Sequence, residues 1–358
     1  MLIFVILLIL LFLFVPPIKK VDLAEEDYLS KKSTLSIKGF FVLWVFLSHF
    51  RNYIDTTNGG FLMESYLWLC EQVGQLCVVM FLFYSGYGVF SSIRRKPNYM
   101  QHFIRKRLLP VWFCFAICVF LFVIENLAFS IHYSFLDVFL AFTGWTSIGN
   151  DNWYMFVIFI LYIFLFLCFR YIEAGNEKYG LIIFSILSFL FVAVLYIAGK
   201  ESWWYNTLLC FSLGMWYAYL KDKIDKFINK STKNYFVVLC ISFCLVIVLR
   251  FLSGWHGVFF CAYSLFVAVF IVIISAKIRF RSMFLAIIGK HVFSIYILQR
   301  LVFRFFEHFE LNKNIELFFI LALIVTILIS FIYDKLFLIL INQIGRKNIK
   351  GVEDVKRN

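Results

Sequence analysis

The sequence predicts an all-α protein that crosses a membrane many times, and three observations lead to this fold class. Hydrophobic residues make up 63% of the 358 positions and charged residues only 15%, whereas a soluble domain needs about a quarter of its residues charged. The apolar residues form long continuous runs rather than the short alternating strands of a membrane β-barrel. Lysine and arginine gather in every second loop between these runs, which is typical of a multi-pass helical protein.

Apolar runs of roughly 17–25 residues can span the hydrocarbon core of a bilayer. The sequence contains eleven such predicted spans, at 1–17, 39–56, 66–90, 108–129, 152–171, 180–198, 203–220, 235–252, 256–276, 283–303 and 316–341. The first is short, ends at Pro16-Pro17, and lacks a basic n-region and a small-residue cleavage site, so we expect an anchor rather than a removed signal. We therefore expect an extra N-terminal hydrophobic span at 1–17, a membrane domain at 18–341 and a basic tail at 342–358.

The positions of lysine and arginine predict the orientation of the chain. One set of alternate loops, together with the tail, holds 26 of them, and the opposite set holds six. Because basic loops stay in the cytoplasm, we expect a multi-pass plasma-membrane protein with a cytoplasmic C-terminus. The net charge of +13 follows this alternation, so we expect the lipid bilayer as a partner and no nucleic acid. No internal repeat supports an inverted-repeat transporter.

The sequence lacks the common signatures of metal and nucleotide sites. The nine cysteines lie almost wholly inside apolar runs, and no histidine or carboxylate completes a metal set beside them. We interpret them as small apolar packing residues and expect no metal. No P-loop, zinc signature, G-x-S-x-G or Rossmann pattern is present.

His49 is the most informative polar residue. It follows Lys38 after ten intervening residues, nearly all apolar, which places it about 16 Å along a helix and near the middle of a roughly 30 Å core. Polar groups at that depth are costly and usually face a cavity or a partner. From the residues alone, His49 is either a structural histidine bonded to another helix or a general base.

The segment 91–107 carries six cations in fourteen residues, Arg94, Arg95, Lys96, Arg105, Lys106 and Arg107. The positive-inside rule explains much of this charge. Alternatively, Arg105 and Arg107 adjoin a span, where a guanidinium fork can bind a phosphate of a cytosolic cofactor through two hydrogen bonds. Both interpretations stay open on the residues alone.

The sequence FLFYSGYGVF ends the predicted span 66–90 on the same side. Gly86 and Gly88 predict close approach of a second helix, while Ser85 and Tyr87 offer hydroxyl groups to a ligand.

On the opposite side, GNDNWYMF opens the predicted span 152–171. Asp151 and Asn152 in it either cap that helix or take part in a site. Trp153 belongs at the outer interface, where amphipathic rings are enriched. We expect Glu125, near an outer span end, to be solvated.

Several segments occur in a distinctive order between about 36 and 341: KGFFVLWVFLSHF, FLFYSGYGVF, IRKRLLPVW, DNWYMFVIFILYIF, WWYNTLLCFSLGMWYAYLKDKI and IGKHVFSIYILQRLVF. Together they resemble the acyltransferase-3 family of bacterial membrane O-acyltransferases, which move acetyl or related groups onto cell-surface sugars. Two positions depart from the family pattern: Ile104 stands where an R-x-x-R motif commonly has arginine, and Gln299 stands where many members have histidine.

The resemblance implies a ten-helix acyltransferase-3-like core, with the span 1–17 outside it. It implies acetyl-CoA as the acyl donor and His49 as the catalytic residue, either a base that deprotonates an acceptor hydroxyl or a carrier of the acyl group. The residues expected on the donor side are Lys38, Arg105, Lys106, Arg107, Ser85 and Tyr87. Those expected on the acceptor side are Arg51, Asp55, Asn152 and Trp153.

We therefore predict a membrane O-acyltransferase that moves an acyl group, expected to be acetyl, from cytosolic acyl-CoA to a hydroxyl of a cell-surface or lipid-linked sugar. A reactive residue at mid-depth fits a reaction whose donor and acceptor lie in different compartments. The alternative is a sugar-lipid flippase or transporter, or a polymerase of surface polysaccharide, with His49 in the translocation path. Such a protein would not need CoA.

Overall fold

The computed structural model describes residues 27–56, 60–151, 153–280 and 282–355. Within these residues the regular elements are all helical and no strand occurs, which confirms the all-α fold class. The predicted span 1–17 lies outside the described residues.

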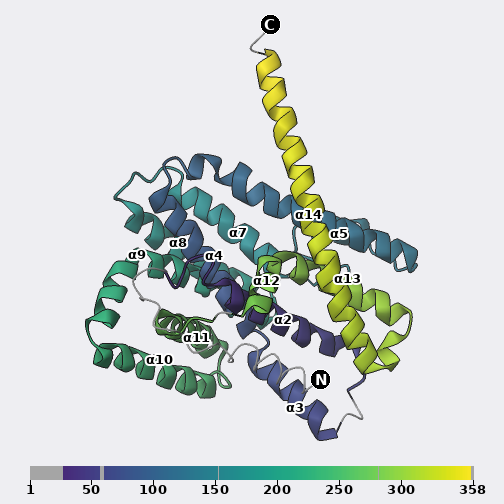
Figure 1. Ribbon diagram of the computed structural model, residues 1–358, viewed down its shortest axis with the longest axis horizontal. Coiled ribbons are helices and arrows are strands. Elements are labelled where there is room, and N and C mark those ends of the chain that lie inside the picture. The colour runs from purple at the N-terminus through teal and green to yellow at the C-terminus, as the bar shows by residue number, and fades with distance from the viewer. Residues whose placement is uncertain (1–26, 57–59, 152, 281, 356–358) are drawn as a thin grey trace. The chain divides into compact units, whose positions relative to one another are not determined.

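Figure 1 labels most of the helices. They are α2 (Leu35–Phe50), α3 (Gly60–Val73), α4 (Leu76–Arg95), α5 (Leu109–Ala128), α6 (Phe135–Ala141), α7 (Trp153–Phe169), α8 (Glu177–Ile197), α9 (Leu209–Lys230), α10 (Thr232–Leu252), α11 (Gly257–Lys277), α12 (Met283–Lys290), α13 (Val292–His308) and α14 (Ile315–Val355). A 3₁₀ turn, η1 (Arg51–Tyr53), follows α2, and a π-helical turn, η3 (Ile104–Leu108), precedes α5.

Six helical stretches in the described part of the chain are long and apolar enough to cross a membrane, or up to seven if α12 and α13 count as one broken span. This fits a multi-pass membrane protein. The predicted total of eleven spans and the ten-helix core stay predictions, because α2 and α7 are shorter than the other spans and α9 carries several charges.

Helix interruptions and helix ends differ from several predicted spans. The span 66–90 contains a turn at Gly74 between α3 and α4, although Gly60–Arg95 counts as one of the six stretches, and the span 283–303 breaks at His291 between α12 and α13 with a bend of 79°. An apolar run does not record where a helix is interrupted, which explains both differences.

The backbone of α14 stays helical from Ile315 to Val355 (Figure 1), so the predicted tail begins inside a helix. No proline follows position 341 to end that helix.

The described residues form two compact units, each assembled from separate stretches of the chain. Unit 1 consists of the chain up to Ser48 with Gly59–Ile104 and Trp153–Lys290. Unit 2 consists of His49–Asn58, Arg105–Asn152 and the chain from His291 on. The boundary crosses α2, so this helix contributes to both units.

The segment before α2 is fixed to the end of α9 inside unit 1. The Tyr28 hydroxyl donates a hydrogen bond to Asp225 Oδ1 over 2.6 Å and lies 2.8 Å from the Tyr217 hydroxyl. Burial, followed by the neighbouring Tyr217 and Asp225, raises the pKa of the Tyr28 phenol, so the phenol stays protonated and keeps donating. Lys221 pairs with Asp225 at 2.6 Å and with Asp27 at 3.3 Å. These contacts hold the start of α2, and hence Lys38, in place.

Two glycines allow α4 and α9 to pack closely in unit 1. A Cβ on Gly86 would lie 2.0 Å from the carbonyl oxygen of Phe211, and a Cβ on Gly214 would lie 2.1 Å from that of Phe83. Backbone meets backbone at both positions, which is the close approach that the sequence predicts for Gly86. The same prediction is wrong for Gly88, which is exposed and would have no atom within 4 Å of its Cβ.

We expect Gly86→Ala to destabilise the protein and Gly88→Ala, its matched control on the same helix, to leave it as stable or more stable. The added methyl of Gly86→Ala overlaps backbone atoms that cannot move aside, an overpacking effect of about 1–3 kcal/mol. At Gly88 alanine only improves helix propensity, by up to about 1 kcal/mol. Thermal unfolding in detergent measures both variants. Equal unfolding temperatures would contradict the close packing described here.

Candidate active site

Packing in unit 2 fixes the end of α2, where His49 is the penultimate residue. The next residue, Phe50, is fully buried, and its ring centroid lies 5.6 Å from that of Phe303, 4.7 Å from that of Phe318 and 5.3 Å from that of Phe319. Aromatic contacts at these separations immobilise a helix end. They hold the backbone of His49 against α13 and α14.

Gln299 on α13 is the hydrogen-bond partner of His49. Its side-chain Nε2 lies 3.0 Å from His49 Nδ1 and donates to the carbonyl oxygen of Tyr296 over 3.1 Å. A carbonyl can only accept, so the amide nitrogen, and not the amide oxygen, faces both groups. In this arrangement His49 Nδ1 accepts the hydrogen bond, and the proton of the neutral imidazole lies on Nε2.

The amide oxygen of Gln299 has no hydrogen-bond partner among the described residues, although the side chain is fully buried. A buried polar atom without a partner is uncommon and calls for a functional or structural explanation. Turning the amide by half a rotation would place this oxygen at His49 Nδ1. The ring proton would then move to Nδ1, and Nε2 would present a lone pair.

Two arginines follow Gln299 on α13, one helical turn apart. Arg304 pairs with Glu125 at 3.3 Å and donates hydrogen bonds to the Ile148 carbonyl at 2.9 Å and to Asn126 Oδ1. Arg300 pairs with Asp151 at 2.9 Å and donates to the Tyr53 hydroxyl at 3.4 Å, in both cases through Nη1. The two guanidinium groups are similarly buried, but only that of Arg304 uses both of its Nη atoms.

Glycine at position 149 permits the contact between Arg304 and the loop that follows α6. Gly149 has a φ of +104°, and a Cβ there would lie 1.8 Å from Arg304 Nη1. The next residues of this loop also bond locally, since Asn150 Oδ1 accepts from the Ile148 amide and Ser147 Oγ accepts from the Asp151 amide. The loop thereby presents the Asp151 carboxylate to Arg300.

The expected donor-side residues divide between the two units. In unit 1, the Lys38 ammonium lies 5.2 Å from the ring centroid of Tyr84, a cation–π contact that places it beside α4, where Ser85 and Tyr87 also lie. In unit 2, Arg105, Lys106 and Arg107 form the π-helical turn η3 and are all exposed. π-Helical turns are rare and are often found at functional sites.

The expected acceptor-side residues are only partly brought together. Arg51 lies on η1 two residues after His49, and Asp55 is exposed a few residues later in the same unit. Trp153 is the first residue of α7 and belongs to unit 1, while Asn152 lies outside the described residues. The functional roles of all eleven expected site residues stay predictions.

Sequence reasoning missed the partners of His49 on α13. Gln299 was visible only as a departure from a family pattern, and Arg300 and Arg304 were counted as loop charges although Arg300 lies inside the predicted span 283–303. The expectation that Glu125 is solvated is wrong: the residue is 8% exposed and pairs with Arg304. The sequence did contain one signal for these contacts: two arginines lie one helical turn apart at the end of a span, and such arginines need buried partners.

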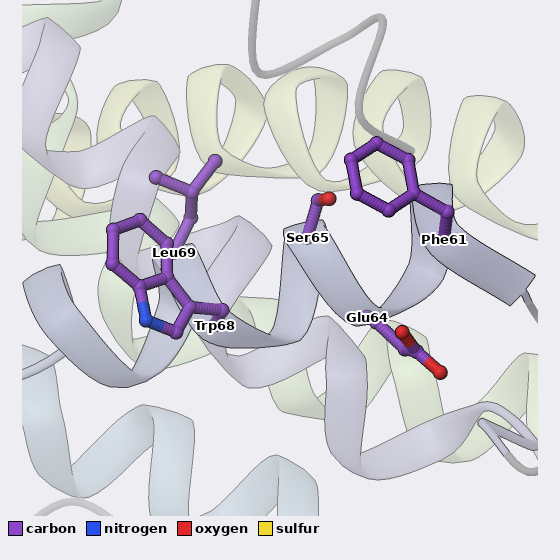
Figure 2. A pocket seen from close by; sticks show the side chains of 5 residues that line it. All are labelled: Phe61, Glu64, Ser65, Trp68 and Leu69. Carbon is purple, nitrogen blue, oxygen red and sulfur yellow. The ribbon is translucent and has the colours of Figure 1, made fainter.

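A hollow elsewhere on the surface does not involve these residues. It lies over α3 and is lined by Phe61, Glu64, Ser65, Trp68 and Leu69 (Figure 2). All five belong to α3, and Phe61, Glu64 and Trp68 are exposed. None of the expected site residues contributes to it.

Comparison with known proteins gives one match. Residues 36–335 match the model of the acyltransferase-3 family, which is described as an acyltransferase domain. No curated protein and no solved structure matches the chain.

We expect the hydrogen bond from Gln299 to determine which nitrogen of His49 carries the proton. Nitrogen-15 spectra of protein labelled at histidine distinguish a protonated Nε2 from a protonated Nδ1. In the wild type, the neutral His49 ring should carry its proton on Nε2. Gln299→Met keeps a similar volume but removes both polar atoms, so the proton should redistribute between the two nitrogens.

His49→Gln identifies the His49 signals by removing them, and the thermal unfolding temperature confirms that each variant is folded. Identical His49 spectra in the wild type and Gln299→Met would show that the hydrogen bond has no influence on the ring.

Proposed function

The chain belongs to the acyltransferase-3 family, and from this premise we propose that it is a membrane O-acyltransferase with His49 as its catalytic residue. We propose acetyl-CoA as the donor and a hydroxyl of a cell-surface or lipid-linked sugar as the acceptor. The observation that carries the proposal is the hydrogen bond between His49 and the buried amide of Gln299. This hydrogen bond orients the ring, and a turn of the same amide frees Nε2 to act as a general base.

In the proposed reaction, the oxygen of the acceptor hydroxyl attacks the carbonyl carbon of the acyl thioester while His49 Nε2 takes the hydroxyl proton. The carbon–sulfur bond then breaks, and the departing CoA sulfur receives the proton from His49. The products are the acyl ester and CoA. General base catalysis of this kind contributes typically about 10²–10⁴-fold to the rate.

For Nε2 to accept a proton, the ring proton must lie on Nδ1. Rotation of the Gln299 amide makes this tautomer possible, because after half a rotation the amide oxygen accepts a hydrogen bond from Nδ1–H. The imidazolium formed during the reaction is then stabilised by a hydrogen bond to that oxygen. The rotation costs the hydrogen bond to the Tyr296 carbonyl and leaves that buried oxygen without its donor, about 1–3 kcal/mol.

The donor would bind through its phosphates to the exposed cations of η3. Arg105 and Arg107 offer planar guanidinium forks that match phosphate oxygens, and Lys106 adds a third positive charge. Lys38, on the same helix as His49, is proposed to contact the donor as well. Ser85 and Tyr87 on α4 would add hydroxyl groups to the donor side.

The donor part of this proposal predicts that CoA protects the purified protein against thermal unfolding. At a ligand concentration of 100 times Kd, binding stabilises the folded state by about 2.7 kcal/mol. Arg105→Gln combined with Arg107→Gln should remove most of this protection. Lys178→Gln, which removes an exposed cation from the first turn of α8, should keep it.

Pantetheine, which lacks the nucleotide phosphates, is the ligand control and should protect little. If CoA leaves the unfolding temperature of the wild type unchanged, a sugar-lipid flippase or transporter becomes the better account. If the double variant is protected as well as the wild type, η3 has no part in donor binding.

A further inference from the structure

Arg300 is a buried cation whose hydrogen-bonding capacity is only partly used. Its side chain is 12% exposed, and its contacts with Asp151 and Tyr53 both involve Nη1. Its Nε is buried and has no hydrogen-bond partner among the described residues. Leaving a buried charged donor unsatisfied is costly in free energy, so a partner for this edge of the guanidinium is expected.

Arg304 provides a comparison in the same surroundings, because it uses both of its Nη atoms. It lies one turn further along α13, its side chain is 11% exposed, and it contacts a carboxylate, a side-chain amide and a backbone carbonyl. Its carboxylate partner, Glu125, is itself buried. Arg304 therefore has the contacts of a structural residue that joins α5, α13 and the loop before Asp151.

The counter-ion of Arg300 is different from that of Arg304. The side chain of Asp151 is 54% exposed and therefore largely solvated. Its backbone has a φ of +45°, in the left-handed region that non-glycine residues rarely adopt. A solvated carboxylate on one Nη atom leaves the Nε edge available to a second anion, since a guanidinium has five N–H donors.

A second cation lies near His49. Arg51 follows His49 by two residues, its side chain makes no ion pair or hydrogen bond with any other described residue, and the charges of Arg300 and Arg51 both act on the imidazole. A partly unsatisfied guanidinium and an unpaired one thus lie close to the proposed catalytic ring. Carboxylates and phosphates are the groups that such forks bind best.

We propose that Arg300, together with Arg51, binds an acid group of the acceptor, so that the hydroxyl acylated at His49 belongs to a negatively charged sugar. The proposal rests on the proposed function and specifies its substrate class. The acid group is a carboxylate on the sugar ring or a phosphate that links the sugar to another group. Its role is to position the acceptor, because binding energy away from the reacting oxygen orients that oxygen toward the thioester.

Three acceptors that share one ring test the proposal: methyl glucoside is neutral, methyl glucuronide carries a carboxylate, and glucose 1-phosphate carries a phosphate. With acetyl-CoA as donor, the wild type should use at least one acidic sugar with a kcat/KM about tenfold or more above that of methyl glucoside, which corresponds to about 1.4 kcal/mol. The difference between the two acids identifies the acid group. Equal use of all three sugars would overturn the proposal.

Arg300→Gln should abolish the preference for acidic sugars, because it should lower the kcat/KM for acidic sugars about tenfold more than the kcat/KM for methyl glucoside. Arg300→Lys keeps the charge but loses the fork, so it should retain only part of the preference. A loss of activity that is equal for neutral and acidic sugars would assign Arg300 a structural role. Unchanged unfolding temperatures without ligand show that both variants are folded.

Release of the CoA thiol, measured with and without sugars, distinguishes failure of the proposed acyltransferase function from failure of the proposal about acidic sugars. No release by the wild type, with or without sugars, would contradict the proposed function itself. If thiol is released but no sugar is acylated, sugar binding tests the proposal instead. Methyl glucuronide or glucose 1-phosphate must then raise the unfolding temperature of the wild type and not that of Arg300→Gln. No such shift would overturn the proposal while leaving the acyltransferase activity in place.

Discussion

Polar groups buried in a membrane protein must find partners within the protein, and the hydrogen bond between Gln299 and His49 is the pairing on which the candidate active site depends. It joins the end of α2 to the middle of α13, two segments 250 residues apart in the sequence. The aromatic packing around Phe50 supports it by fixing the helix end on which His49 lies. Without these contacts, the imidazole would have no defined orientation or tautomer.

The same constraint separates structural from functional charges along α13. Arg304 satisfies it with Glu125, Asn126 and the Ile148 carbonyl, and so it belongs to the framework of unit 2. Arg300 satisfies it incompletely, because its Nε has no partner among the described residues. Gln299 also leaves one buried atom without a partner. Neighbouring residues with unused hydrogen-bonding capacity are expected where a substrate completes the pairing.

Much of the fold could be predicted from the sequence, because composition and apolar runs report directly on burial in a bilayer. The helical class, the membrane association and the approximate positions of the helices in the described part of the chain follow from those patterns. The breaks at Gly74 and His291 could not be predicted, since hydrophobicity continues across them. The helical continuation of α14 was missed for the converse reason: the apolar run ends before the helix does.

The site was predictable only where a residue stands out from its own segment. His49 does so, because it is an imidazole in an apolar run that begins at Lys38. Its partner Gln299 does not, because pairing between α2 and α13 depends on tertiary structure and leaves no periodic signal. The burial of Glu125 likewise follows from the position of Arg304, which periodicity does not give.

The central claim is that His49 catalyses acyl transfer from CoA. The most direct test is to follow acetyl-labelled CoA with purified protein in proteoliposomes, comparing the wild type with His49→Ala at equal folded concentration. The account predicts that label leaves CoA only when His49 is intact, appearing in water or sugar if His49 is a base and transiently on the protein if it carries the acyl group. Equal loss of label with His49→Ala would contradict the account.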